Sequence, residues 1–180
     1  MNWFLVAAVA VAAIAAYTDF RTGKIPDWLT LPALVAAPIA RAATFSMNGG
    51  GSEVALFEGA YSIGGAAVCS IVPLILYRQN ALGGGDLKLF AALGAICQPN
   101  IGVEVQMYAF IAATLMAPAR LAYEGKLFQT VRNAGTLIAN MVRPKEKRES
   151  VDEKAMSWFR MGPAVLVGTL LAAFLHRGAP

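Results

Sequence analysis

Long apolar runs separated by short polar segments constrain this chain more than any other feature of its sequence. An α-helix rises 1.5 Å per residue, so about 20 apolar residues cross the hydrocarbon core of a bilayer. The pattern predicts an all-α fold, a polytopic membrane bundle of about six transmembrane helices. The fourth run is short for a span and the last is marginal. The runs lie at about 2–17, 28–45, 56–77, 87–98, 101–119 and 161–176.

The composition favours a membrane protein over a soluble one. Hydrophobic residues make up 57% of the 180 residues, and charged residues only 14%, which is well outside the usual balance of soluble domains. No Lys or Arg precedes the first run, whereas a signal peptide begins with a positively charged region. We therefore expect the first run to be retained as a helix.

The basic residues are placed unevenly, and their placement predicts an orientation. Lys and Arg number 15 against 11 Asp and Glu, and 13 of the 15 lie in the segments 18–27, 78–88 and 120–160. The segments 46–55 and 98–101 hold none. The positive-inside rule places the basic segments in the cytoplasm and both termini outside. The net charge of +4 then reflects topology and attraction to the anionic lipid bilayer, with no indication of nucleic-acid binding.

The chain is expected to form a single domain over residues 1–180 with one cytoplasmic insertion at 121–160. Apolar and basic positions alternate along 121–142, as in an amphipathic helix that lies on the inner leaflet. Residues 143–149 read Arg-Pro-Lys-Glu-Lys-Arg-Glu, which is typical of a solvated, charged linker. We expect the amphipathic segment to help hold the orientation of the bundle without supplying a catalytic group.

Two aspartates lie where an apolar run meets a short basic segment that contains glycine. Asp19 follows the first run, and Asp86 precedes the fourth. The predicted topology puts both on the cytoplasmic face, although a carboxylate is costly at the edge of a hydrocarbon slab. Paired carboxylates can catalyse hydrolysis by acid–base chemistry without a metal ion. Asp19 and Asp86 are therefore the candidate catalytic residues.

The other reactive residues disfavour several alternative chemistries. The single histidine, His176, lies at the outer end of the last run, too far from either aspartate for a His-based triad. Cys69 and Cys97 are isolated in apolar runs with no Cys-x-x-Cys pair, which favours a role as small packed hydrophobes over a zinc or redox site. We expect neither a metal nor a cofactor.

Both aspartates belong to strings that resemble the motifs of a known family. Residues 83–86 read Gly-Gly-Gly-Asp, which fits a Gly-x-Gly-Asp signature. Residues 19–27 read Asp-Phe-Arg-Thr-Gly-Lys-Ile-Pro-Asp, close to an Asp-x-Arg-x-x-x-Ile-Pro-Asn stretch. In this order the chain resembles the type IV prepilin peptidases, in the short, CpaA/TadV-like form that serves Flp (tight-adherence) pili. Residues 161–165, Met-Gly-Pro-Ala-Val, are similar to the family's last helix, which carries a Gly-Pro pair.

This resemblance implies a function and a location. The protein would be an aspartic endopeptidase of the bacterial inner membrane, with Asp19 and Asp86 both catalytic. Its partner would be a prepilin, a membrane helix with a short basic leader that is cut at the cytoplasmic face. Larger members carry paired Cys-x-x-Cys motifs linked to N-methylation, and because this sequence has none we expect cleavage without methylation. Asp27 stands where the family usually has Asn.

Residues beside the aspartates are candidates for motif geometry and substrate access. Gly83 and Gly85 have no Cβ, so a substrate backbone can approach Asp86. Lys88 lies about 200° around a helix from Asp86 and is expected to meet a phosphate or an acidic residue of the substrate. Arg21 is expected to meet lipid phosphate in preference to the neighbouring aspartate. The full set is Gly83, Gly85, Lys88, Arg21, Pro26 and Asp27.

Two other functions stay open on the sequence alone. A noncatalytic scaffold of a pilus or secretion machine would need the aspartates only as markers of topology. An ion-coupled carrier subunit would use membrane carboxylates as relay sites. The carrier is disfavoured because both aspartates are expected at one face of the membrane.

Overall fold

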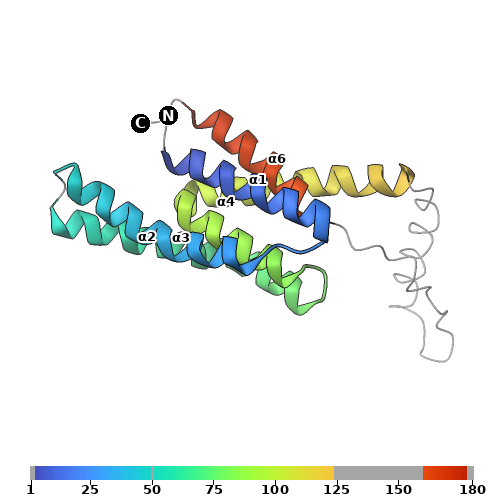
Figure 1. Cartoon of the computed structure of the whole chain (residues 1–180), viewed down its shortest axis with the longest axis horizontal. Coiled ribbons are helices and arrows are strands. Elements are labelled where there is room, and N and C mark those ends of the chain that lie inside the picture. Colours follow the sequence, from blue (N-terminus) through green and yellow to red (C-terminus); the bar gives the residue numbers. More distant parts are fainter. Residues whose placement is uncertain (1–2, 50, 124–159, 178–180) are drawn as a thin grey trace. The chain divides into compact units, whose positions relative to one another are not determined.

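The computed structural model describes residues 3–49, 51–123 and 160–177, and the regular structure in them is helical. Residues 1–113 and 160–180 form one compact unit, and residues 114–159 form a second. The described part of the second unit is the last few turns of α4. The helices are α1 (Trp3–Thr22), α2 (Asp27–Met47), α3 (Ser52–Arg78), α4 (Gly84–Tyr123) and α6 (Gly162–Leu175) (Figure 1).

α4 consists of two antiparallel arms. The backbone of Gln98 leaves the helical region, with φ 63° and ψ 170°, and the next residue is Pro99, a residue well suited to start a helix. The rings of Phe90 and Phe110 stack with their centroids 5.5 Å apart. In a straight helix the same two residues would be about 30 Å apart. The chain therefore reverses direction at Gln98.

The predicted all-α membrane bundle is confirmed. Each of the six apolar runs lies in a helix, and the fourth and fifth form the two arms of α4. Within the described residues, four helical stretches are long and apolar enough to cross a membrane: α1, α2, α3 and Gly84–Ala119 of α4, the last of which includes the reversal at Gln98. α6 is apolar but has 14 residues, which is about 21 Å of helix. The number of crossings stays a prediction, as does the single domain.

The predicted amphipathic helix and charged linker cannot be compared with the structure over most of their length. Residues 121–123 are the end of α4. The rest of 121–142, and all of 143–149, lies outside the described residues.

Small residues let the helices of the first unit approach one another closely. α1 packs mainly on α6, and α2 mainly on α3 (Figure 1). A Cβ added at Gly65 of α3 would clash with the Gly94 carbonyl oxygen of α4, and one added at Gly168 of α6 would lie 2.5 Å from the Ala109 amide nitrogen of α4. These are contacts between helix backbones, which small residues permit in membrane bundles.

A buried arginine inside α2 holds the reversal of α4. Arg41 is 7% exposed, and its Nη2 donates a hydrogen bond to the Ile96 carbonyl oxygen at 2.8 Å. Its guanidinium carbon lies 3.7 Å from the centroid of the Phe4 ring. At the same reversal, the side-chain amide of Gln98 donates a hydrogen bond to Glu58 Oε2 of α3 at 2.6 Å. Polar contacts thus fix the end of the first arm of α4 against α2 and α3.

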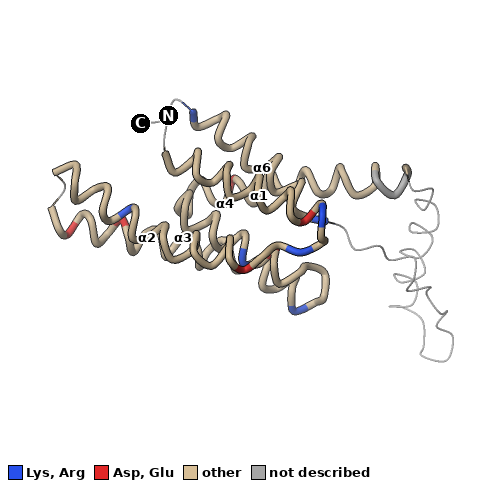
Figure 2. The backbone as a smooth tube through the Cα atoms, in the orientation of Figure 1, with Lys and Arg blue, Asp and Glu red and all other residues tan. Residues whose placement is uncertain are grey.

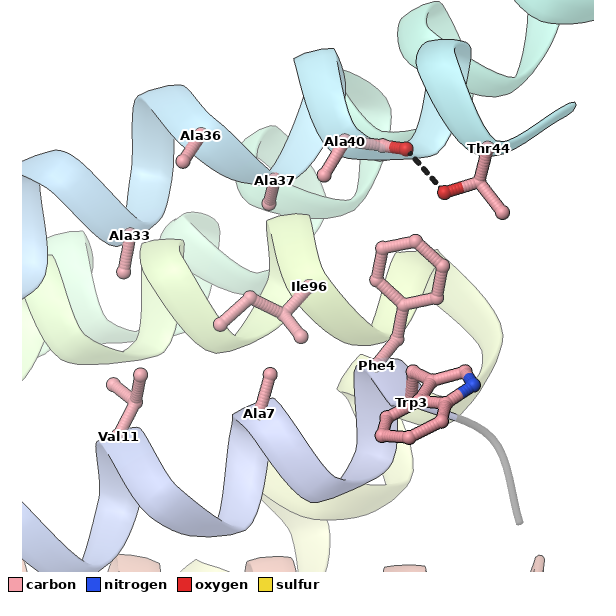
Figure 3. Close-up of a pocket in the computed structure, with 10 residues that line it drawn as sticks. All are labelled: Trp3, Phe4, Ala7, Val11, Ala33, Ala36, Ala37, Ala40, Thr44 and Ile96. Carbon is pink, nitrogen blue, oxygen red and sulfur yellow. Dashed lines mark hydrogen bonds between the residues drawn. The ribbon is translucent and has the colours of Figure 1, made fainter. Parts of the chain in front are cut away.

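An apolar cavity of about 390 Å³ lies between α1 and α2, with Ile96 of α4 among its lining residues. Figure 3 shows alanines of both helices facing this space. None of the predicted site residues lines it. The full lining is Trp3, Phe4, Ala7, Val11, Ala33, Ala36, Ala37, Ala40, Thr44 and Ile96.

Candidate active site

Asp19 lies in the last turn of α1 and is buried, with 6% of its surface exposed. α1 ends soon after it, because Gly23 adopts φ 68° and donates its N–H to the Asp19 carbonyl oxygen at 2.8 Å. Glycine takes this left-handed conformation without strain. A carboxylate in the last turn of a helix meets the negative end of the helix dipole. Asp19 therefore needs a hydrogen-bond donor from another element.

That donor is the first residue of α6. The N–H of Gly162 donates to Asp19 Oδ2 at 2.9 Å. Two residues earlier, the Arg160 guanidinium donates a hydrogen bond to the Phe20 carbonyl oxygen. The end of α1 and the start of α6 are thus joined by two hydrogen bonds, although they are distant in the sequence.

Asp86 lies in the first turn of α4 and is half-buried. Gly83 acts as the N-cap of α4, because its carbonyl oxygen accepts the N–H of Leu87 at 3.2 Å. The Gly83 backbone also forms a hydrogen bond to the Asp86 carboxylate. This is the capping-box arrangement, in which an acid at the third helical position reaches back to the N-cap. The glycine motif therefore fixes the conformation of Asp86 locally.

The two candidate catalytic residues come together at one end of the first unit. The carboxyl groups of Asp19 and Asp86 are near enough for their charges to act on each other. Two carboxyl groups from different helices thus face one region of the protein, and acid–base hydrolysis uses a pair of such groups.

The loop between α1 and α2 lies against the first turn of α4. Pro26 is the N-cap of α2. The next residue, Asp27, pairs with Lys88 of α4, with Nζ to Oδ1 at 2.6 Å. A Cβ added at Gly85 would lie 3.1 Å from the Ile25 Cβ, so glycine allows the loop this close approach. In the structure Lys88 pairs with Asp27, and its contact with a phosphate or an acidic residue of the substrate stays a prediction.

Arg21 points to the surface at the end of α1. The residue is exposed, and its guanidinium carbon lies 5.4 Å from the centroid of the Tyr17 ring. The partner of the Asp19 carboxylate is thus the α6 backbone and not this neighbouring cation. Contact of Arg21 with lipid phosphate stays a prediction.

The remaining reactive side chains lie apart from the aspartates. His176 pairs with Glu104, with Nε2 and Oε2 2.7 Å apart. Cys69 and Cys97 are buried free thiols. Across the described ranges, no group of three or more His, Cys, Asp and Glu side chains could hold a metal ion.

Both aspartate motifs fall within a segment that matches a known protein family. Residues 6–118 match the Type IV leader peptidase family. The chain belongs to this family. Membership confirms the resemblance to the type IV prepilin peptidases and makes the protein a peptidase of the membrane-embedded, leader-removing kind. The CpaA/TadV-like form stays a prediction. Comparison of this leader peptidase with curated proteins found no match, and comparison with solved structures found none.

Asp19 lies within the matched segment, but its hydrogen-bond donor at the start of α6 lies outside it. Gly162 and Arg160 come after residue 118, the last that matches the family. Sequence reasoning noted the Met-Gly-Pro string at 161–163 as a resemblance but gave it no role. The available signal was a glycine just before a proline at the start of an apolar run, where proline begins a helix. The sequence did not show which helix this start would contact.

Proposed function

We propose that the protein is an aspartic endopeptidase that removes the basic leader of Flp-type prepilins at the cytoplasmic face of the inner membrane. The observation that supports this most directly is the convergence of Asp19 and Asp86, two buried or half-buried carboxyl groups from different helices. Family membership supports prepilin cleavage. The Flp-type substrate and the cytoplasmic face rest on the motifs and on the placement of basic residues.

The paired carboxyl groups can carry out hydrolysis in two steps. The ionised group takes a proton from water, and the water oxygen bonds to the scissile carbonyl carbon while the protonated group donates a hydrogen bond to the carbonyl oxygen. A proton then passes to the amide nitrogen and the carbon–nitrogen bond breaks. The products are a leader with a new carboxylate and a mature pilin with a new amine.

The position of the pair suits a substrate cut next to its membrane helix. Asp19 is near the end of α1, which is long enough to cross the bilayer, and Asp86 is near the start of the first arm of α4. Water and the polar leader can reach this level from the aqueous side. The apolar helix of the prepilin can stay in the bilayer.

Coexpression with an Flp-type prepilin tests the proposal. The wild type should remove the leader, detected as a mobility shift and as a new N-terminus by mass spectrometry. Asp19→Asn and Asp86→Asn should each lower the rate by roughly 10³-fold or more, because an amide can neither accept nor release the proton. Membrane insertion should be unchanged, since it depends on the apolar helices.

The matched control is Glu53→Gln, the same acid-to-amide change at an exposed residue in the first turn of α3. It should process prepilin like the wild type. Normal processing by Asp86→Asn would instead favour the noncatalytic scaffold.

A further inference from the structure

The start of α6 is in direct contact with one of the two candidate catalytic carboxyl groups. Gly162 N–H donates to Asp19 Oδ2 at 2.9 Å, and this hydrogen bond is buried. α1 and α6 lie side by side (Figure 1). One carboxylate oxygen of Asp19 thus accepts a hydrogen bond from the protein backbone, which restricts rotation of the side chain.

The N-terminus of α6 offsets the unfavourable position of the Asp19 carboxylate at the C-terminal end of α1. Asp19 is in the last turn of α1, where free carbonyl groups point toward a carboxylate. The N-terminus of α6 presents free N–H groups and the opposite end of a helix dipole. Arg21 is turned over the Tyr17 ring, and Arg160 binds the Phe20 carbonyl oxygen. The backbone of α6 therefore supplies the hydrogen bond that a basic side chain supplies in many buried carboxylate sites.

Glycine at position 162 allows this contact sterically. A Cβ added there would lie 2.8 Å from the Asp19 Cβ, 2.9 Å from Asp19 Oδ2 and 3.0 Å from the Ala16 Cα. Two of these three atoms belong to Asp19 itself. Any side chain at 162 would move the carboxyl group, or would move the start of α6 away from it.

Arg160 is partly exposed and contacts the same junction. Its guanidinium donates to the Phe20 carbonyl oxygen, which lies one residue after Asp19 in the last turn of α1. A carbonyl in the last turn has no partner within its own helix. This bond ties the segment before α6 to the turn that carries Asp19.

We propose that residues 160–163 form a third part of the active site, in which Gly162 positions Asp19 through its backbone N–H and Arg160 anchors the junction. This part lies beyond the segment that matches the family, residues 6–118. The inference rests on the proposed function, because positioning matters only if Asp19 is catalytic. Gly162 is a positioning residue and need not touch the substrate.

Gly162→Ala tests the inference with purified protein and prepilin in detergent. A displaced catalytic group lowers turnover more than binding, so kcat should fall about 10- to 100-fold while KM changes by less than about threefold. The matched control is Gly168→Ala, which also adds a Cβ on α6 against a helix backbone, that of α4. Thermal unfolding should show Gly168→Ala to be the more destabilised of the two, because its added Cβ lies closer to backbone atoms, while kcat per folded molecule should fall only in Gly162→Ala.

Arg160 offers a second test at a partly exposed residue. Arg160→Gln should lower kcat by roughly threefold to tenfold, and Arg160→Lys should recover part of the loss because it keeps a charged donor. Wild-type kcat in Gly162→Ala, or an equal fall in Gly168→Ala, would overturn the inference while leaving the proposed function intact. Failure of the wild type to cleave prepilin would overturn both.

Discussion

The three glycines before Asp86 meet different neighbours, so they impose different requirements on the site. A Cβ at Gly83 would lie 3.0 Å from Asp86 Oδ2, and one at Gly85 would lie 3.1 Å from the Ile25 Cβ. A Cβ at Gly84 would lie 3.5 Å from the Tyr77 ring, an ordinary contact distance. Gly83 and Gly85 are the fixed positions of the Gly-x-Gly-Asp signature, and the structure gives each a steric reason to be glycine.

Gly83→Ala and Gly84→Ala should therefore differ in activity. Gly83→Ala pushes against the Asp86 carboxylate and should lower the cleavage rate roughly tenfold, because small displacements of a catalytic group are costly. Gly84→Ala places a better helix former in the first turn of α4 and should keep the rate within about twofold of the wild type. Cleavage per folded molecule of coexpressed prepilin measures both. An equal loss in the two variants would show that the run needs flexibility and not a particular close contact.

Local motifs could predict the candidate site only in part. Asp19 and Asp86 were found because each lies in a short string of recognisable spacing. The contact of Asp19 with Gly162 joins residues 143 apart in the sequence, and no local pattern encodes such a pairing. The Asp27–Lys88 ion pair was missed for the same reason. Both of its side chains are more than two-fifths exposed, so the pair contributes about 1 kcal/mol at most.

Among the elements, α4 departs most from a regular helix, and its reversal places Asp86. The first arm starts at Gly84, with Asp86 in its first turn, and ends at Gln98. The φ of 63° and ψ of 170° at Gln98 lie in a region used almost only by glycine. The Gln98 amide donates to Glu58 at 2.6 Å, and Arg41 donates to the Ile96 carbonyl oxygen. These bonds hold a strained backbone, whose cost is about 1–3 kcal/mol.

Two substitutions at Gln98 separate the strain from the hydrogen bond. Gln98→Ala and Gln98→Gly both remove the bond to Glu58, but only glycine also relieves the positive φ. Gln98→Gly should therefore be the more stable of the two by about 1–3 kcal/mol, even though glycine weakens an ordinary helix. Thermal unfolding in detergent compares them directly. If Gln98→Ala unfolds at the same temperature as Gln98→Gly or higher, the strain assigned to this residue is absent.

Hydrophobic pattern predicted where the helices lie but not how two of them are joined. The runs at 87–98 and 101–119 were separated by a short polar segment, and the structure reverses the chain there. Pattern alone did not show that Gln98 itself would carry the break. The role of Arg41 was not predicted, because a single charge changes the average hydropathy of an apolar run very little. An ionisable residue within a predicted span needs a partner. This requirement could have indicated that Arg41 contacts another helix.

At the scale of the molecule, many large apolar side chains of the described helices lie on the exterior, and small residues make close contacts between these helices. Figure 2 shows long uncharged stretches along the helices. Large side chains such as Val35, Ile39, Leu56, Ile63 and Leu170 are exposed. A surface of this kind is unfavourable in water over so large an area, whereas a bilayer covers it. The fold therefore requires a membrane around it. The orientation of the protein in that membrane decides on which side the aspartates act.

Cysteine labelling can establish that orientation. Lys24 lies in the loop next to Asp19, and Asn48 follows the other end of α2; both are exposed. The native Cys69 and Cys97 are buried, so the wild type gives a low background. The positive-inside rule puts Lys24 in the cytoplasm, so a membrane-impermeant maleimide should label Asn48→Cys in intact spheroplasts and Lys24→Cys only after permeabilisation. The opposite pattern would place the aspartates outside, away from a cytoplasmic leader, and equal labelling at both would mean that α2 does not cross the membrane.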